Sequence, residues 1–388
     1  MADGGDALTV RIVESIAELP AAEWNACAGS GNPFTSHAFL AALETSGSAT
    51  AKTGWAPHHL VAEDASGRVL AVAPNYLKSH SYGEYVFDHG WADAYGRAGG
   101  RYYPKLQVAV PFTPVPGRRL LCRPGSSAAA AQAALIEALR TLVERAGLSS
   151  AHATFCTGEE AEAFAEAGWL IRRGFQYHWS NDGYRSFDDF LARLNHSKRK
   201  TIRRERREVA AQGLGVEMLT GAALTSAHWD AFFELYIATS DRKWGSPYLT
   251  RQFFHELGRV MPGRVALVLA RHGERPVGGA LNLIGDDALY GRNWGGRGDY
   301  PFLHFEACYY QAIEFAIGRG LARVEAGAQG DHKLPRGYLP VPTWSAHWIR
   351  DRGFRKAVAD FLRREGEMIA HEMGSLGEYS PFKKPEGS

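Results

Sequence analysis

The chain has 388 residues, and at roughly 100–200 residues per domain this length predicts two domains. Hydrophobic residues make up 45% and charged residues 22%, as in ordinary folded proteins, and a formal net charge of +2 argues against a general polyanion binder. The four cysteines form no CxxC pair and none has a nearby histidine at metal-ligand spacing, which argues against a zinc site and a disulfide scaffold.

The N-terminal residues are small and polar, and they lack the charged and apolar regions of a signal peptide. No apolar run approaches the roughly 18 residues that span a membrane. These features predict a cytoplasmic protein without a membrane span.

Five sequence blocks recur in the same order in the two halves of the chain. The pairs are Leu19-Pro-Ala-Ala-Glu-Trp24 with Leu224-Thr-Ser-Ala-His-Trp229, 32–43 with 246–257, 59–75 with 266–282, the helix ends at Gly147 and Gly320, and Tyr177-His-Trp179 with Ala346-His-Trp348. In the third pair, two apolar runs flank a polar turn that contains glycine, which indicates a β-hairpin. The repeat predicts an α/β fold with mixed sheets, in two tandem domains related by internal duplication.

The spacing between the blocks predicts that the first half carries an additional segment. We place it at about 81–123, where aromatic and charged residues alternate. Such a segment could line a sugar or peptide groove or simply pack on its own aromatic rings. Its candidate ligand-binding residues are Tyr82, Tyr85, Asp88 and Trp91.

The first domain is therefore placed at 1–185 and the second at 186–350, with a C-terminal helix and polar tail at 351–388. Ser186, followed by Asp189, indicates a helix start. Within 197–207 seven of the eleven residues are basic and one is acidic, and we expect this run on a helix of about 195–212.

On that helix, Lys200, Arg203, Arg204 and Arg207 share one face with i+3 and i+4 spacing, near Lys198, while Ile202 and Val209 point to the core. The basic face is either solvated or neutralised by a polyanion. Arginine suits phosphate geometry, so the candidates are a tRNA backbone, a nucleotide-linked substrate or a CoA.

In the second half we expect strands at about 264–271, 277–284, 288–294 and 322–327, with a helix at about 303–319. One stripe of this helix is apolar and belongs to the core; it contains Phe305, Cys308, Tyr309, Ala312, Ile313, Ala316 and Ile317.

Three polar clusters in the second half could line a site. They are Arg242, Lys243 and Trp244; then Tyr290, Arg292, Asn293 and Trp294; and finally Glu325, Gln329, His332 and Lys333. The third follows a strand, where α/β sheets place their sites. Glu325 or His304 would act as general base, and Lys333 could hold an oxyanion or a phosphate. A surface loop or a packed strand end remains the alternative for the first two clusters.

Several of these segments together resemble a known family. They are 198–213, Leu281-Asn-Leu-Ile ahead of Tyr290, the block 302–327, and the segments 32–40 and 78–88. The chain resembles the FemA/FemB/FemX-type family, in its proteobacterial FemAB-like branch of the GNAT acyltransferase superfamily. The chain lacks the helical coiled-coil arm that some relatives insert in the second domain.

The resemblance implies an N-acyltransferase that forms an amide between an aminoacyl-tRNA and an amine acceptor, such as a nucleotide-linked cell-wall precursor or a small molecule. No tightly bound cofactor is expected, because the tRNA or an acyl-CoA would be a co-substrate. Two alternatives stay open: an acyl-CoA-dependent N-acyltransferase, although no Arg/Gln-x-x-Gly-x-Gly/Ala loop is evident, and a module that binds cell-wall precursors without catalysis.

Overall fold

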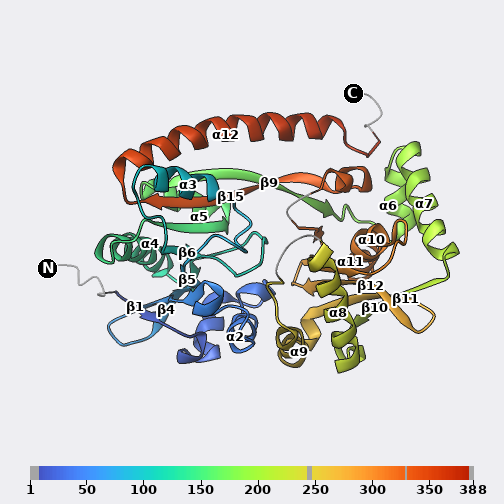
Figure 1. The fold of residues 1–388 in the computed structure, drawn as a ribbon, viewed down its shortest axis with the longest axis horizontal. Helices are drawn as coiled ribbons and strands as arrows, with labels where there is room; N and C mark the ends of the chain where they lie inside the picture. Colours follow the sequence, from blue (N-terminus) through green and yellow to red (C-terminus); the bar gives the residue numbers. More distant parts are fainter. Residues whose placement is uncertain (1–7, 243–246, 328–329, 384–388) are drawn as a thin grey trace. The chain divides into compact units, whose positions relative to one another are not determined.

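The computed structural model describes residues 8–242, 247–327 and 330–383, with only the backbone at 241 and 242. The chain forms two compact units (Figure 1). Unit 1 contains Met1–Gly174 and Pro342–Ala370, and unit 2 contains Phe175–Val341 and His371–Ser388. Each unit combines helices with a mixed sheet, which confirms the predicted α/β fold class.

Unit 1 is built around two groups of paired strands. The first has the order β1 (Thr9–Val13), β3 (His59–Glu63), β4 (Val69–Ala73), β7 (Leu121–Cys122), and the second has the order β2 (Trp55–Pro57), β5 (Asn75–Lys78), β6 (Lys105–Val108), β8 (Ser150–Cys156), β15 (Leu339–Ile349). Its helices are α1 (Ala21–Ala28), α2 (His37–Thr45), α3 (His89–Arg97), α4 (Ala128–Arg145), α5 (Gly158–Glu166) and the first part of α12 (Arg352–Glu378). The strand β6 lies inside the predicted insert, so this part of the insert belongs to a sheet.

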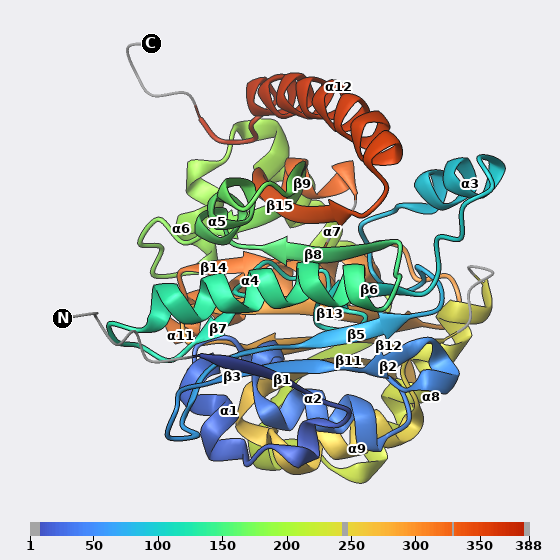
Figure 2. The same cartoon turned by 90° about the vertical axis from the view of Figure 1, so that its left-hand side faces the viewer.

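Helix α4 covers one face of the unit 1 strands (Figure 2). Its residues Leu135, Leu139 and Val143 are four apart and fall on one stripe, and all three are buried. They pack in one cluster with Leu60 of β3 and Ala71 of β4. The apolar stripe of this amphipathic helix therefore packs on the strands and forms part of the core of unit 1.

The strand β4 continues into β5 through Pro74, and the two belong to different sheets. Proline has no N–H to donate to a ladder, so a break in pairing is expected at this residue. In unit 2 the corresponding strand, β12 (Arg275–Ile284), continues through the matching residue, Leu281; its register with one neighbouring strand shifts between Leu281 and Asn282, and with the other between Pro276 and Gly278.

Unit 2 is built on one sheet with the order β10 (Leu214–Thr220), β11 (Val265–His272), β12, β13 (Ala288–Gly296), β14 (Arg323–Glu325), β9 (Leu170–Ser180). Its helices are α6 (Phe187–Arg193), α7 (His196–Ala211), α8 (Ser226–Arg242), α9 (Arg251–Val260), α10 (Leu303–Phe305) and α11 (Gln311–Arg319). The expected strands of the second half are confirmed within a few residues.

The helix expected at 303–319 is present, but its middle turn, Glu306–Tyr310, is a π-helix that joins α10 to α11. Turns of this kind are rare in proteins, and those that occur inside α-helices are often found at functional sites. The apolar stripe is confirmed as core: Tyr309, Ala312, Ile313 and Ala316 are buried, and the other members pack against them. The helix ends at Gly320, as predicted, and this glycine adopts the left-handed conformation.

The duplication is visible in matching strand pairs. In unit 1, β6 pairs in parallel with β8, and in unit 2, β13 pairs in parallel with β14. Asn75 and Asn282, which the repeat aligns, each donate a side-chain hydrogen bond to a backbone carbonyl, that of His58 (2.8 Å) and Ala266 (3.3 Å) respectively. The two buried amides therefore perform the same local task in both copies.

The two halves of the sequence exchange their last strands. The strand β15, from the second half, pairs antiparallel with β8 of unit 1. The end of β9, from the first half, pairs antiparallel with β14 of unit 2. Each sheet is thus completed by a segment distant in sequence.

A close approach of backbones in unit 2 gives a stability prediction. A Cβ atom at Gly295 of β13 would lie 2.5 Å from the backbone of Leu235 and Tyr236 in α8. We expect Gly295→Ala to lower the free energy of unfolding by about 1–3 kcal/mol, because the helix must move away. Chemical denaturation measures the change. Gly215→Ala in β10 is the matched control, because a Cβ there meets no atom within 4 Å; equal stability losses in both variants would contradict the prediction.

Candidate active site

The candidate site lies where β13 and β14 part. These two strands pair in parallel over only three residue pairs, from Ala288 with Arg323 to Tyr290 with Glu325. β14 ends at Glu325, whereas β13 continues to Gly296. Parallel α/β sheets place their ligands beyond the carboxyl ends of strands that diverge in this way.

Glu325 faces His178 of β9 across the antiparallel pair β14–β9. Both side chains are buried, with 4% and 8% of their surface exposed. Glu325 Oε1 accepts a hydrogen bond from Arg323 Nε (2.9 Å), but Oε2 lies 3.7 Å from His178 Nε2, and neither of these two atoms has a hydrogen-bond partner among the residues that the structure describes. Leaving a buried polar atom unpaired costs about 1–3 kcal/mol, so two such atoms face to face mark a place for a ligand group.

Burial sets the protonation of this pair. Burial raises the pKa of Glu325 to about 7, against the opposing charge of Arg323. Burial lowers the pKa of His178 to about 4, and the charges of Arg323 and Lys333 act in the same direction. Near neutral pH the imidazole is therefore uncharged and the carboxyl group is partly ionised, which suits a group that takes up and releases a proton.

Lys333 lies in a 3-10 segment, η7 (Asp331–Arg336), that follows β14. Its side chain is buried, Nζ donates to the carbonyl of Gly327 (2.9 Å), and burial lowers its pKa to about 8. A buried ammonium group can hold a developing oxyanion or a phosphate. The charge of Lys333 acts on His178, so these two groups share one electrostatic environment.

A group of aromatic rings lies on the same unit. The ring of His304 is 5.3 Å from Trp294, 5.4 Å from Tyr309 and 5.9 Å from His332. The Tyr309 hydroxyl and His332 Nε2 are 2.8 Å apart and hydrogen-bonded. His304, His332 and Trp294 are three of the candidate site residues predicted from the sequence, and the structure places them in one group of rings.

The remaining predicted residues of the second half are distributed as follows. Tyr290 is buried at the end of the parallel ladder, where its hydroxyl accepts from Arg323 (3.4 Å), and Arg292 and Asn293 are half-buried further along β13. Arg242 ends α8, and its side chain lies outside the description, as do residues Lys243, Trp244 and Gln329.

The basic helix is confirmed as α7. Ser186 begins a separate helix, α6, and Asn195 begins α7, where its side chain accepts from the N–H of Lys198. Ile202 and Val209 are buried, as predicted.

The predicted basic face is exposed. Lys200, Arg203, Arg204 and Arg207 all lie on the surface of α7, and Lys198 is half-exposed. Two of them form exposed ion pairs, Arg203 with Asp188 (3.1 Å) and Arg204 with Glu208 (3.5 Å), and such pairs contribute little to stability. This face, which we call the basic face, is available to an anion.

The predicted residues of the insert are mostly internal. Trp91 and Asp88 are buried in unit 1, Tyr85 is half-buried, and Tyr82 is 60% exposed. Asp88 pairs with Lys105 and accepts from the Tyr102 hydroxyl (2.7 Å). Asp88 and Trp91 therefore hold the insert on its own unit, whereas Tyr82 is open to a ligand.

Unit 1 has a closed counterpart of the strand end. His152 and His347 occupy the register positions of Glu325 and His178, and their Nδ1 atoms are 2.7 Å apart and hydrogen-bonded to each other. Beyond them, the carbonyl of Thr154 accepts from the buried Arg119 (2.8 Å), and that of Phe155 accepts from the N–H of Gly117 (3.0 Å). The chain's own loop thus covers this strand end.

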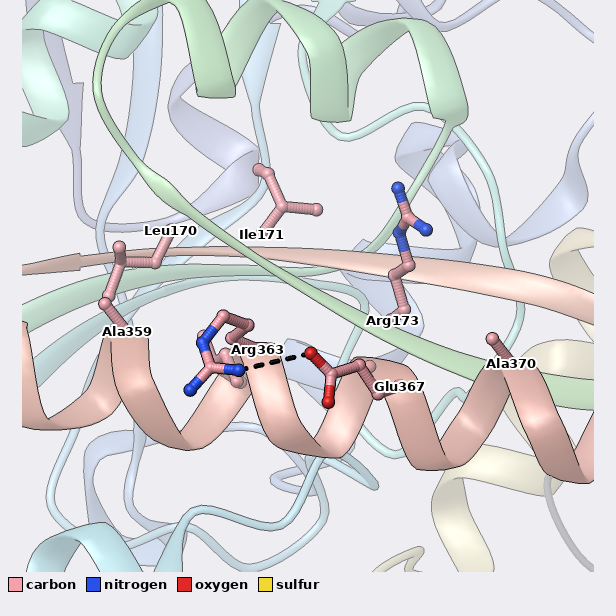
Figure 3. Close-up of a pocket in the computed structure, with 9 residues that line it drawn as sticks. Leu170, Ile171, Arg173, Ala359, Arg363, Glu367 and Ala370 are labelled. Atoms are coloured by element: carbon pink, nitrogen blue, oxygen red, sulfur yellow. Dashed lines mark hydrogen bonds and ion pairs between the residues drawn. The ribbon is translucent and has the colours of Figure 1, made fainter.

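A groove of about 400 Å³ lies on unit 1 between the start of β9 and α12 (Figure 3). Leu170, Ile171 and Leu362 contribute apolar surface, and an ion pair of Arg363 with Glu367 (3.2 Å) lies on the helix side. Among the residues described, no cluster of histidine, cysteine, aspartate and glutamate could hold a metal ion. In the same part of the chain, no helix is both long and apolar enough to span a membrane.

The chain has a tandem GNAT-like fold. Its features are two duplicated α/β units, the exchange of their last strands, and a parallel strand pair that opens at its carboxyl end. The chain belongs to the FemAB-like family, described as peptidoglycan biosynthesis/recognition, whose model matches residues 15–384. A search of curated proteins finds no match.

Solved structures share this fold. The crystal structure of FemX has a TM-score of 0.55 at 11% identity, over 88% of this chain and 98% of FemX. The C-terminal domain of a putative lysylphosphatidylglycerol synthetase from Agrobacterium fabrum has a TM-score of 0.56 at 10% identity, over 90% and 97%. L-PGS from Bacillus licheniformis has a TM-score of 0.52 at 8% identity, over 86% and 98%.

Proposed function

We propose that the chain is an aminoacyltransferase that joins the aminoacyl group of an aminoacyl-tRNA to an amine acceptor. The observation that carries the proposal is the pair of buried atoms Glu325 Oε2 and His178 Nε2 at the open strand end, which have no hydrogen-bond partner within the described part of the chain. The family's description supports a nucleotide-linked cell-wall precursor as the acceptor.

In the proposed reaction the acceptor nitrogen attacks the ester carbonyl carbon, a C–N bond forms and the C–O bond to the tRNA ribose breaks. Glu325 accepts the proton that the amine loses and returns it to the departing ribose oxygen. Lys333 donates to the carbonyl oxygen while it carries negative charge. No covalent enzyme intermediate is needed, because the ester is already activated.

The exposed basic face of α7 supports a tRNA as donor. Four cations on one helix face suit a phosphate backbone, and closely spaced cations gain most from a polyanionic ligand. We assign the acceptor to unit 1, whose own strand end is covered, with Tyr82 as one of the exposed aromatic residues that would contact it.

A panel of radiolabelled aminoacyl-tRNAs, offered with amine acceptors, tests the function. We expect label in an amide product, with transfer lost after treatment with RNase. Absence of RNase-sensitive transfer to every acceptor would overturn the tRNA assignment. Transfer from an acyl-CoA in the same assay, with stabilisation of the protein by CoA, would instead favour the CoA-dependent alternative.

The proposed roles also predict a bell-shaped pH dependence of kcat/KM. Glu325 must be ionised to accept a proton, so the rate should rise with pH through about 7. Lys333 must be protonated to donate, so the rate should fall with pH through about 8. In Lys333→Arg the alkaline limb should move to higher pH while the acid limb stays; a profile that does not change would remove Lys333 from the mechanism.

A further inference from the structure

The buried face of α7 carries the acidic residue of the basic run. Glu205 is 3% exposed and receives two hydrogen bonds from Arg336 Nη2, at 2.8 and 2.9 Å. The hydroxyl of Tyr310, in the π-helical turn, donates to Glu205 Oε2. A carboxylate with three charge-assisted or hydroxyl contacts is fixed in place.

Arg336 connects this carboxylate to the segment that carries Lys333. The two residues lie three apart in η7. Arg336 Nη1 donates to the backbone carbonyl of His332 (2.6 Å), and its guanidinium lies 3.5 Å over the ring of Phe305. One planar guanidinium therefore holds the backbone next to Lys333 against α7.

The next residue of α7, Arg206, makes a second set of contacts. Arg206 forms two hydrogen bonds with Glu306 (3.0 and 3.1 Å) and one with Glu314 (2.9 Å). Glu306 begins the π-helical turn, and Tyr309 in the same turn is hydrogen-bonded to His332. Helix α7 therefore contacts the segment from 331 to 336 directly through Glu205 and Arg336, and indirectly through the π-helical turn.

We propose that Glu205 and Arg336 are positioning residues that hold the Lys333 amine at the open end of β14. The helix whose exposed face is basic also fixes, from its buried face, the segment on which a reacting group sits. A buried ion pair often adds little net stability compared with apolar residues of similar size, so its presence here fits a role in geometry. The inference rests on the proposed function only for the role of Lys333 in the reaction.

Competitive labelling of lysines with acetic anhydride, followed by mass spectrometry over a range of pH, tests the proposal without a substrate. In the wild type the Lys333 amine should titrate at about 8. In Glu205→Gln the released segment becomes solvated, so the midpoint should rise by at least one unit, toward the ordinary value of about 10.4. Glu208→Gln is the matched control, because Glu208 is an exposed acid on the same helix, and the midpoint should not move.

Two milder variants keep the test decisive if Glu205→Gln does not fold. Tyr310→Phe removes one hydrogen bond to Glu205, and Arg336→Lys keeps the charge but loses the planar contact to His332. Each should raise the Lys333 midpoint by a smaller amount, in protein whose thermal unfolding stays cooperative. Wild-type midpoints in these variants, or in a folded Glu205→Gln, would overturn the proposal.

Filter binding of bulk tRNA separates this inference from the proposed function. Glu205→Gln should bind tRNA within about twofold of the wild type, because the basic face is untouched. Failure of the wild type to bind tRNA would remove the donor assignment, whereas the lysine titration would still decide the role of Glu205 and Arg336.

Discussion

Replacement of Glu325 by glutamine should lower the rate of amide formation by about 10²–10⁴-fold, the usual contribution of a positioned general base. Glutamine has nearly the same shape and its carbonyl oxygen can still accept from Arg323 Nε. It cannot accept the proton of the attacking amine. The initial rate of transfer from the labelled aminoacyl-tRNA measures the loss.

Glu274→Gln is the control for this substitution, because Glu274 is an exposed acid at the turn between β11 and β12. Circular dichroism of both variants should match the wild type. A Glu325→Gln protein that transfers at more than a tenth of the wild-type rate would assign the base to another group, and His178→Gln would then be the next variant to measure.

Neutralising the basic face should weaken tRNA binding by about 10³-fold at 0.1 M salt. The variant replaces Lys200, Arg203, Arg204 and Arg207 of α7 by glutamine. Each phosphate contact contributes about 0.7–0.9 to the slope of log K against log salt, so the slope should fall by about 3. Filter binding at several salt concentrations gives both quantities.

The matched control removes the same number of charges from elsewhere on the surface. It replaces the exposed residues Arg68, Arg140, Arg145 and Lys356 of unit 1 by glutamine. Net charge alone would weaken binding equally in both variants. An equal loss would therefore show that tRNA does not recognise the face of α7.

Features that depend on local patterns could be predicted from the sequence. The stripe from Phe305 to Ile317 repeats at helical spacing, so its burial followed from periodicity. The basic residues of α7 were expected on one exposed face because Ile202 and Val209 had to point the other way. Polar residues that follow a strand point to Glu325 and Lys333, and the structure places both at the strand end.

Features that depend on partners distant in sequence could not be predicted. The residue opposite Glu325 in the sheet register is His178, from the first half, and a strand's own alternation does not reveal which strand will lie beside it. The one signal was the echo of Tyr177-His-Trp179 in Ala346-His-Trp348, which we interpreted as evidence for the repeat and not for a site. The π-helical turn also went unforeseen, because its residues keep an ordinary helical pattern.

The exchanged strands have a consequence for synthesis of the protein. Unit 1 needs residues Pro342–Ala370, so it remains incomplete until the chain has left the ribosome as far as Ala370. Until then the edge of β8 that later pairs with β15 lacks its partner, and an unpaired edge favours aggregation. The two halves of this chain therefore cannot complete their folding one after the other during translation. Either half produced alone should become resistant to proteases only after the other half is added in trans.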